Sequence, residues 1–142
     1  MSSLYSAEML RLALTLAQVP PLAEPDCRHE GRAQPCGSRI ALSLRCDAQA
    51  RVTAIGIDMQ ACAVGQASAA LLAQSIIGKD RSDIAAALAG IERWLADPEA
   101  PRPDWPGFAA LDPARSYPAR AGALRLPFAA ALAALDQRQA AA

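Results

Sequence analysis

Residues 40–58 read IALSLRCDAQARVTAIGID, and this stretch predicts the sheet on which the fold is built. Apolar side chains occupy every second position of its first half, the period of a half-buried strand: Ile40, Leu42, Leu44 and Cys46. A second strand is expected from Arg51 to about Asp58, with Thr53, Ile55 and Ile57 on one face. Because only residues 48–50 separate the two runs, we expect an antiparallel hairpin.

Helical patterns lie on both sides of this hairpin. Before it, apolar residues recur at steps of three and four from Tyr5 to Val19, with Ser6 as the expected N-cap. Residues 22–37 lack such a period and read as loop or irregular strand. After the hairpin, a helix is expected from about Cys62 to Ile77, ended by Gly78.

Two further helices are expected in the C-terminal half. One is capped by Ser82 and carries apolar residues at helical spacing as far as Leu95. The proline-rich stretch Asp97–Pro106 reads as a loop, pinned to the core by Trp105, Phe108 and Leu111. The last helix begins between residues 120 and 127, and residues 137–142 are expected to fray. Strands segregated from helices predict an α+β fold, a small antiparallel sheet covered on one face by helices, in a single domain over residues 1–142.

Charge and composition exclude several function classes. The 142 residues include 14 basic and 14 acidic side chains, so the formal net charge is zero and no global basic field attracts nucleic acid or an anionic membrane. No export signal or membrane-spanning segment is evident, and the cytosol is the expected compartment. In a reducing compartment, the four cysteines are expected to be thiols or metal ligands rather than disulfides.

Two of the cysteines stand where a thiolate is stabilised. Cys36 lies in Pro35-Cys36-Gly37-Ser38, a turn before a strand whose backbone amides can point at the sulfur. Cys62 lies at the expected N-terminus of a helix, where the dipole favours negative charge. Because the hairpin between them folds back, both can meet at one end of the sheet and bind a soft metal or transfer sulfur. The alternative is that both are buried and act as small hydrophobic residues.

The other candidate residues have simpler interpretations. Cys46 lies on the apolar face of its strand and is expected to pack in the core. Cys27 and His29 fall in the expected loop, where the histidine is expected to be solvated rather than a ligand. The zinc deaminase pattern fails, because His29 and Glu30 are adjacent and no second cysteine follows Cys36 at the required spacing.

Three segments resemble the U-type iron–sulfur cluster scaffold family, which comprises SufU, IscU and the N-terminal domain of NifU. They are Gly31–Ile40 (GRAQPCGSRI), Ala61–Leu71 (ACAVGQASAAL) followed by Gly78-Lys79, and Tyr117–Leu126 (YPARAGALRL). They look, in order, like the family patterns G-x-x-x-N-P-x-C-G-D-x-I, G-C-A-I-S-x-A-S-A-S-x-L with G-K, and F-P-A-R-x-x-C-x-x-L, and the first segment is shorter than its pattern. The roughly forty residues between Lys79 and the last segment match the insertion of the SufU branch. The resemblance implies a SufE/NifU-like fold.

The resemblance also implies where a metal site stands. In the family, three cysteines and one aspartate hold a nascent cluster, or zinc in SufU. Carried over by position, the cysteines fall on Cys36, Cys62 and Ala123, and the aspartate falls on Ser38. Two of four ligands are therefore replaced, which disfavours zinc. Arg120, which matches the family's arginine, is expected to stabilise the thiolates.

The resemblance implies a carrier protein rather than an enzyme. The first hypothesis is an iron–sulfur cluster scaffold that binds iron or a labile cluster transiently through Cys36 and Cys62, with a borrowed ligand. The second is a persulfide-accepting sulfur carrier, and the third is a degenerate scaffold that acts only as an interaction module. The expected partners are a cysteine desulfurase and cluster-recipient proteins, and a homodimer is left open.

Overall fold

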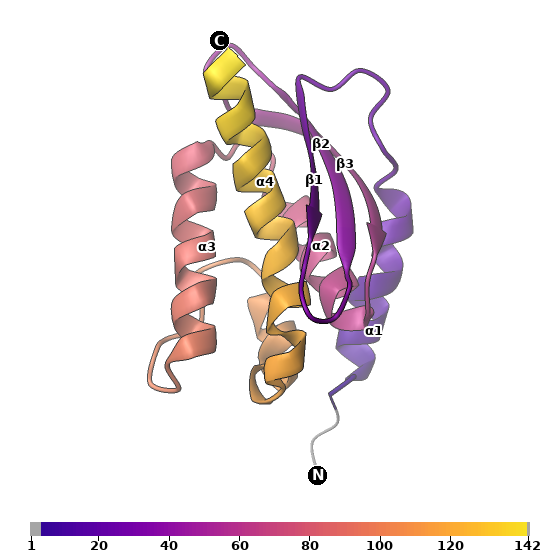
Figure 1. Cartoon of the computed structure of the whole chain (residues 1–142), viewed down its shortest axis with the longest axis vertical. Helices are drawn as coiled ribbons and strands as arrows, with labels where there is room; N and C mark the ends of the chain where they lie inside the picture. Colours follow the sequence, from indigo (N-terminus) through magenta and orange to yellow (C-terminus); the bar gives the residue numbers. More distant parts are fainter. Residues whose placement is uncertain (1–3, 142) are drawn as a thin grey trace.

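The computed structural model describes residues 4–141, and the elements below are those of that range (Figure 1). The α-helices are α1 (Ala7–Leu14), α2 (Ala63–Ser75), α3 (Arg81–Ala96) and α4 (Ala121–Ala141). The strands are β1 (Cys27–Arg32), β2 (Arg39–Cys46) and β3 (Val52–Gln60). Short 3₁₀ helices are η1 (Thr15–Gln18), η2 (Phe108–Ser116) and η3 (Pro118–Arg120).

Within the described residues, the strands form one antiparallel sheet in the order β1-β2-β3. The expected hairpin is present, with Leu42 opposite Ile57. Of the two alternatives for residues 22–37, loop or irregular strand, residues 27–32 form a strand, because β1 pairs with β2 and places Cys27 opposite Leu44. The inward positions of β1 are not a run of large apolar residues, since His29 and Gly31 follow Cys27, so no period-two pattern marks this strand.

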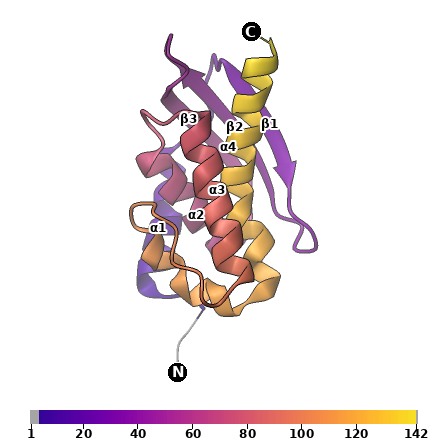
Figure 2. The same ribbon diagram turned by 90° about the vertical axis from the view of Figure 1, so that its left-hand side faces the viewer.

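The helices cover one face of the sheet and confirm the predicted α+β class (Figures 1 and 2). Helix α4 packs on β1 and β2, α2 packs on α4 and α1, and α3 packs on the far side of α4. The largest fully buried side chains come from all four α-helices and the C-cap of α2, from η2 and from β2: Trp94, Phe108, Phe128, Met9, Leu42, Leu44, Leu72, Ile76, Ile84, Ile91, Leu111 and Leu124. One apolar core therefore joins the sheet to the helices.

The helix ends match the sequence in part. Ser6 caps α1 as expected, accepting a 3.1 Å hydrogen bond from the Met9 amide. Helix α3 is capped by Asp80 rather than by Ser82, because Asp80 and Asp83 each accept a hydrogen bond from the other's amide and form a capping box. Helix α4 continues through the tail expected to fray as far as Ala141, and residue 142 lies outside the described range.

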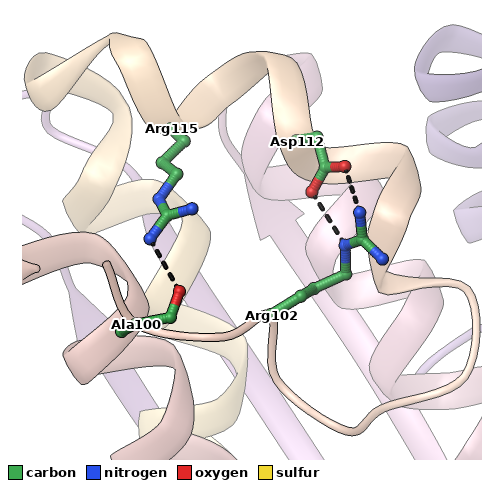
Figure 3. Close-up of polar contacts among 4 residues, drawn as sticks. All are labelled: Ala100, Arg102, Asp112 and Arg115. Atoms are coloured by element: carbon green, nitrogen blue, oxygen red, sulfur yellow. Dashed lines mark hydrogen bonds and ion pairs between the residues drawn. The ribbon is translucent and has the colours of Figure 1, made fainter. Parts of the chain in front are cut away.

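The long connection between α3 and α4 is held in place by polar contacts (Figure 3). Arg115 donates hydrogen bonds to the carbonyl oxygens of Asp97 and Ala100, and Arg102 forms a two-point ion pair with Asp112. Trp105, expected to pin this segment to the core, is buried and donates its indole N–H to the Leu71 carbonyl at 2.9 Å. These contacts hold the connection against the end of α3 and against α2.

The opposite face of the sheet is crossed by residues 20–22. The Leu22 amide donates to the Ser43 hydroxyl at 3.3 Å, and this hydroxyl donates to the Gly56 carbonyl at 3.4 Å. The crossing chain lies directly over Gly56, whose missing side chain makes the approach possible. No helix in the described range is long and apolar enough to cross a membrane.

Candidate thiol site

Cys36 lies at the exposed tip of the β1–β2 turn. The turn is closed by hydrogen bonds from the Gly37 amide to the Ala33 carbonyl (3.0 Å) and from the Ala33 amide to the Ser38 carbonyl (2.9 Å). Gly37 has a φ of +76°, a conformation that glycine adopts without strain. The Cys36 side chain is exposed, so its sulfur is accessible to a reactant from solution.

Ser38 makes the Cys36 thiol more acidic. The Ser38 hydroxyl lies 3.2 Å from the Cys36 sulfur and is itself buried, with 4% of its surface exposed. Hydrogen bonds from the Ser38 hydroxyl and the Ser38 amide lower the pKa of Cys36, and the positive charge of Arg120 lowers it further. From the sequence alone, Ser38 stands out only as the replacement of a ligand. Ser38 follows Cys36 by two residues in a tight turn, and this spacing is the sequence feature that could have predicted the hydrogen bond.

Cys62 occupies the N-cap position of α2 and is half-buried. Its backbone is extended, and its carbonyl accepts a 3.0 Å hydrogen bond from the Gln66 amide. The last rung of the β2–β3 ladder pairs Arg39 with Gln60. Ser38 precedes one member of this pair and Cys62 follows shortly after the other, so both stand at the same end of the sheet.

The start of α4 lies at this same end, visible at the bottom of Figure 1. A Cβ atom built on Gly122 would lie 3.3 Å from the Cβ atom of Ala33 in the Cys36 turn. A Cβ atom built on Gly65, three residues after Cys62, would lie 3.3 Å from the Cβ atom of Ala123. The first turn of α4 therefore contacts both the Cys36 turn and the first turn of α2.

The donors at this end of the sheet do not make a four-ligand metal site. Cys36 and Cys62 occupy two of the four positions that the family resemblance assigns to metal ligands. Ser38 and the fully buried Ala123 occupy the other two, and alanine offers no donor atom. No group of three or more His, Cys, Asp or Glu side chains that could hold a metal occurs among the described residues. His29 lies on β1, half-buried, rather than in the solvated loop expected for it. The donor set does not fit a resident tetrahedral zinc ion.

No protein-family model and no curated protein matches this sequence, but solved structures do. The N-terminal part of a nitrogen-fixing NifU-like protein from Brucella abortus superposes with a TM-score of 0.86 and 29% sequence identity, over 98% of this chain and 96% of that chain. A putative iron–sulfur cluster assembly scaffold protein for the SUF system from Fervidobacterium islandicum AW-1 superposes with a TM-score of 0.80 and 19% identity, over 93% of this chain and 96% of that chain.

This chain is similar in structure to U-type scaffold proteins. The recognition from three sequence segments and the expected NifU-like fold are both confirmed by these superpositions. Assignment to the SufU branch stays a prediction, since the structure with the higher identity is NifU-like.

The other two cysteines form a separate pair at the far end of the sheet. Cys27 is buried in β1 and does not lie in the expected loop, because its strand pairs with β2. Cys46 is half-buried against the core, as its alternation with apolar residues predicts. Burial raises the pKa of Cys27 to about 11 and also raises the pKa of Cys46, so both are neutral thiols near pH 7.

The pH dependence of alkylation is expected to distinguish Cys36 from Cys27 and Cys46. Because its pKa is lowered, Cys36 reacts with iodoacetamide at lower pH than Cys27, whose thiolate forms only as the pH approaches 11. Ser38→Ala removes the main stabilising hydrogen bond and is expected to slow Cys36 alkylation at pH 7 by about five- to tenfold. Peptide mass spectrometry across a pH series measures each rate. Equal rates of Cys36 alkylation in the wild type and in Ser38→Ala would show that the Ser38 hydroxyl does not stabilise the thiolate. Ser43→Ala, which removes a serine hydroxyl elsewhere, is the matched control.

Proposed function

We propose that this protein takes part in iron–sulfur cluster assembly and carries sulfur as a persulfide on Cys36. The observation that carries the proposal is an exposed thiol with a lowered pKa, at the tip of a turn in a U-type scaffold fold. Sulfur transfer needs one reactive thiolate, and stable cluster holding needs a fuller ligand set. Replacement by Ser38 and Ala123 therefore favours sulfur carriage over lasting retention of a cluster.

The transfer step is a thiol–disulfide type of exchange. The donor is a cysteine desulfurase that presents a persulfide, and the Cys36 thiolate attacks its terminal sulfur. The sulfur–sulfur bond of the donor breaks, a new one forms on Cys36, and the donor cysteine leaves as a thiolate. No electrons are gained or lost overall. The Ser38 hydroxyl and Arg120 stabilise the attacking thiolate, and passage of the outer sulfur to Cys62 is the same exchange repeated.

Transfer from a desulfurase is expected to add the mass of one sulfur atom to Cys36. The purified chain is incubated with desulfurase, pyridoxal phosphate and cysteine, and then analysed by mass spectrometry without reductant. The added sulfur is expected on the wild type and on Cys62→Ser, and is expected to be absent from Cys36→Ser. Cys46→Ser is the matched control. A wild-type protein that stays unmodified while the desulfurase turns over would rule the proposal out.

A second candidate function is transient binding of iron or a labile cluster as cargo. It is favoured by the contact of the first turn of α4 with both the Cys36 turn and the first turn of α2. Cys36 and Cys62 would supply two thiolates, and the remaining ligands would come from water, a backbone group, a second chain or a partner's cysteine. Anaerobic reconstitution with iron and sulfide tests it. Cluster absorption that is lost in Cys36→Ser and Cys62→Ser supports it, and its absence from the wild type contradicts it.

The interaction-module hypothesis has a separate readout. If the chain only binds the assembly machinery, a Cys36→Ser/Cys62→Ser double variant is expected to pull down the desulfurase as well as the wild type does, with neither sulfur nor iron acquired by the wild type. This pattern would replace both proposals above.

A further inference from the structure

Two arginines face each other where the sheet ends beside the Cys36 turn. Arg32 and Arg39 are directly opposite in the β1–β2 ladder, and both are exposed. Like charges at directly opposite positions of an antiparallel pair destabilise it. The ion pairs among the described residues are formed by other arginines, Arg81, Arg102 and Arg125. The repulsion between Arg32 and Arg39 is therefore not offset by a salt bridge within this part of the chain.

The neighbouring polar groups in the described part of the chain form no ion pair with Arg32 or Arg39. The Arg39 side chain donates a 3.0 Å hydrogen bond to the neutral amide oxygen of Gln60. Two carboxylates, Glu30 and Asp58, lie on the same face of the sheet as the arginines. They flank Ala41, which is two residues after Arg39 on β2. Neither carboxylate forms an ion pair with either arginine. The two guanidinium groups thus remain available to a partner.

The position of the pair connects it to the thiol. Arg32 is the last residue of β1 and Arg39 is the first of β2, so they form the base of the turn that carries Cys36 at its tip. Arg120, the last residue of η3 just before α4, acts electrostatically on the same sulfur. We call Arg32, Arg39 and Arg120 the arginine collar. Figure 2 shows the β1–β2 turn extending beyond the helices, where a partner can approach it.

We propose that the arginine collar is a docking surface for an acidic segment of the protein that delivers sulfur to Cys36. The inference rests on the proposed function for the role of Cys36, and on charge complementarity for the chemistry of the partner. The whole chain has a formal net charge of zero, so the attraction is local to this turn. Local complementary charge steers a partner and raises its association rate, with a strong dependence on salt.

Two synthetic peptides test the collar. Each carries one cysteine activated as a pyridyl disulfide, flanked by glutamates in one peptide and by glutamines in the other. Cys36 attacks the peptide sulfur and releases thiopyridone, and the release is followed by absorbance in a Cys62→Ser background. At about 10 mM salt, the glutamate peptide is expected to react about tenfold faster than the glutamine peptide. At about 1 M salt, where the screening length is about 3 Å, the rates are expected to agree within about twofold.

Matched variants assign the effect to the collar. Arg32→Gln/Arg39→Gln is expected to reduce the ratio of the two rates to about two or less. The control is Arg28→Gln/Arg45→Gln, which removes the same charge from the same two strands and face at the other end of the sheet. The control is expected to keep the ratio near ten. Because a ratio is compared, a change in the thiolate population of Cys36 affects both peptides equally and cancels.

Each outcome decides the inference. A ratio near one in the starting protein, or an equal loss in both double variants, would overturn the collar as an acidic docking site. Such a result leaves the sulfur-carrier proposal intact if Cys36 still acquires sulfur from the desulfurase. Conversely, a charge-dependent ratio together with no persulfide on Cys36 would retain the docking surface and reject sulfur carriage.

Discussion

The double variant Ser38→Asp/Ala123→Cys is expected to bind one zinc ion per chain after dialysis, whereas the starting protein is expected to retain none. The two changes restore an aspartate and a third cysteine at the positions that the family resemblance assigns to ligands. Cys36 and Cys62 would complete a tetrahedral set of three thiolates and one carboxylate. A completed site of this kind binds zinc with an apparent free energy of about 10 kcal/mol or more at neutral pH. The expected change is therefore from no stoichiometric binding to full occupancy.

Metal analysis and competition with a chromophoric chelator measure this gain. Ser38→Asp/Ala130→Cys is the matched control, because it adds the same two side chains with the new cysteine at another buried alanine of α4. Circular dichroism establishes that each variant is folded. A folded Ser38→Asp/Ala123→Cys protein without zinc would show that the four positions do not converge on one metal.

Gly56→Ala is expected to destabilise the fold by about 3 kcal/mol or more. A Cβ atom at Gly56 would lie 2.5 Å from the Leu22 nitrogen and 2.8 Å from both the Pro20 oxygen and the Pro21 carbonyl carbon. All three are backbone atoms, so no side-chain rotation relieves the overlap. The crossing chain has to move away, which also breaks the hydrogen bond from the Leu22 amide to the Ser43 hydroxyl.

Urea unfolding and thermal melts measure the loss, which corresponds to a fall in Tm of roughly 10 °C for a chain of this size. Gly90→Ala is the control. This glycine lies inside α3, and a Cβ atom there would meet nothing closer than 3.7 Å. Alanine is favoured over glycine in a helix interior by about 1 kcal/mol, so this variant is expected to be slightly more stable. A Gly56→Ala protein as stable as the wild type would contradict the close crossing.

The elements with a strong local period were predictable and those without one were not. The β2–β3 hairpin follows from alternation over residues 40–58, and α1 follows from its three- and four-residue spacing. Strand β1 has no such signal, because its conformation is imposed by hydrogen bonds to β2. Ser82 and Asp80 both suit an N-cap by residue type. The reciprocal bonds of Asp80 with Asp83 decide between them.

The individual residues of the candidate site could be predicted from the sequence, but their arrangement in space could not. The Pro35–Ser38 turn and the N-cap position of Cys62 can be inferred from local sequence alone. The opposition of Arg32 and Arg39 depends on the β1–β2 register, which requires recognising β1 as a strand. The burial of Cys27 depends on the same strand.

The amino-acid sequence by itself determined the α+β class, the hairpin, the place of Cys36 in a turn and the place of Cys62 at the start of a helix, because these depend on neighbours within a few residues along the chain. Only the tertiary structure decided which residues surround Cys36. Ser38 is a close neighbour of Cys36 along the chain, whereas the opposed arginines and the start of α4 reach the turn through strand register and helix packing. These long-range contacts bring together groups that no local pattern relates.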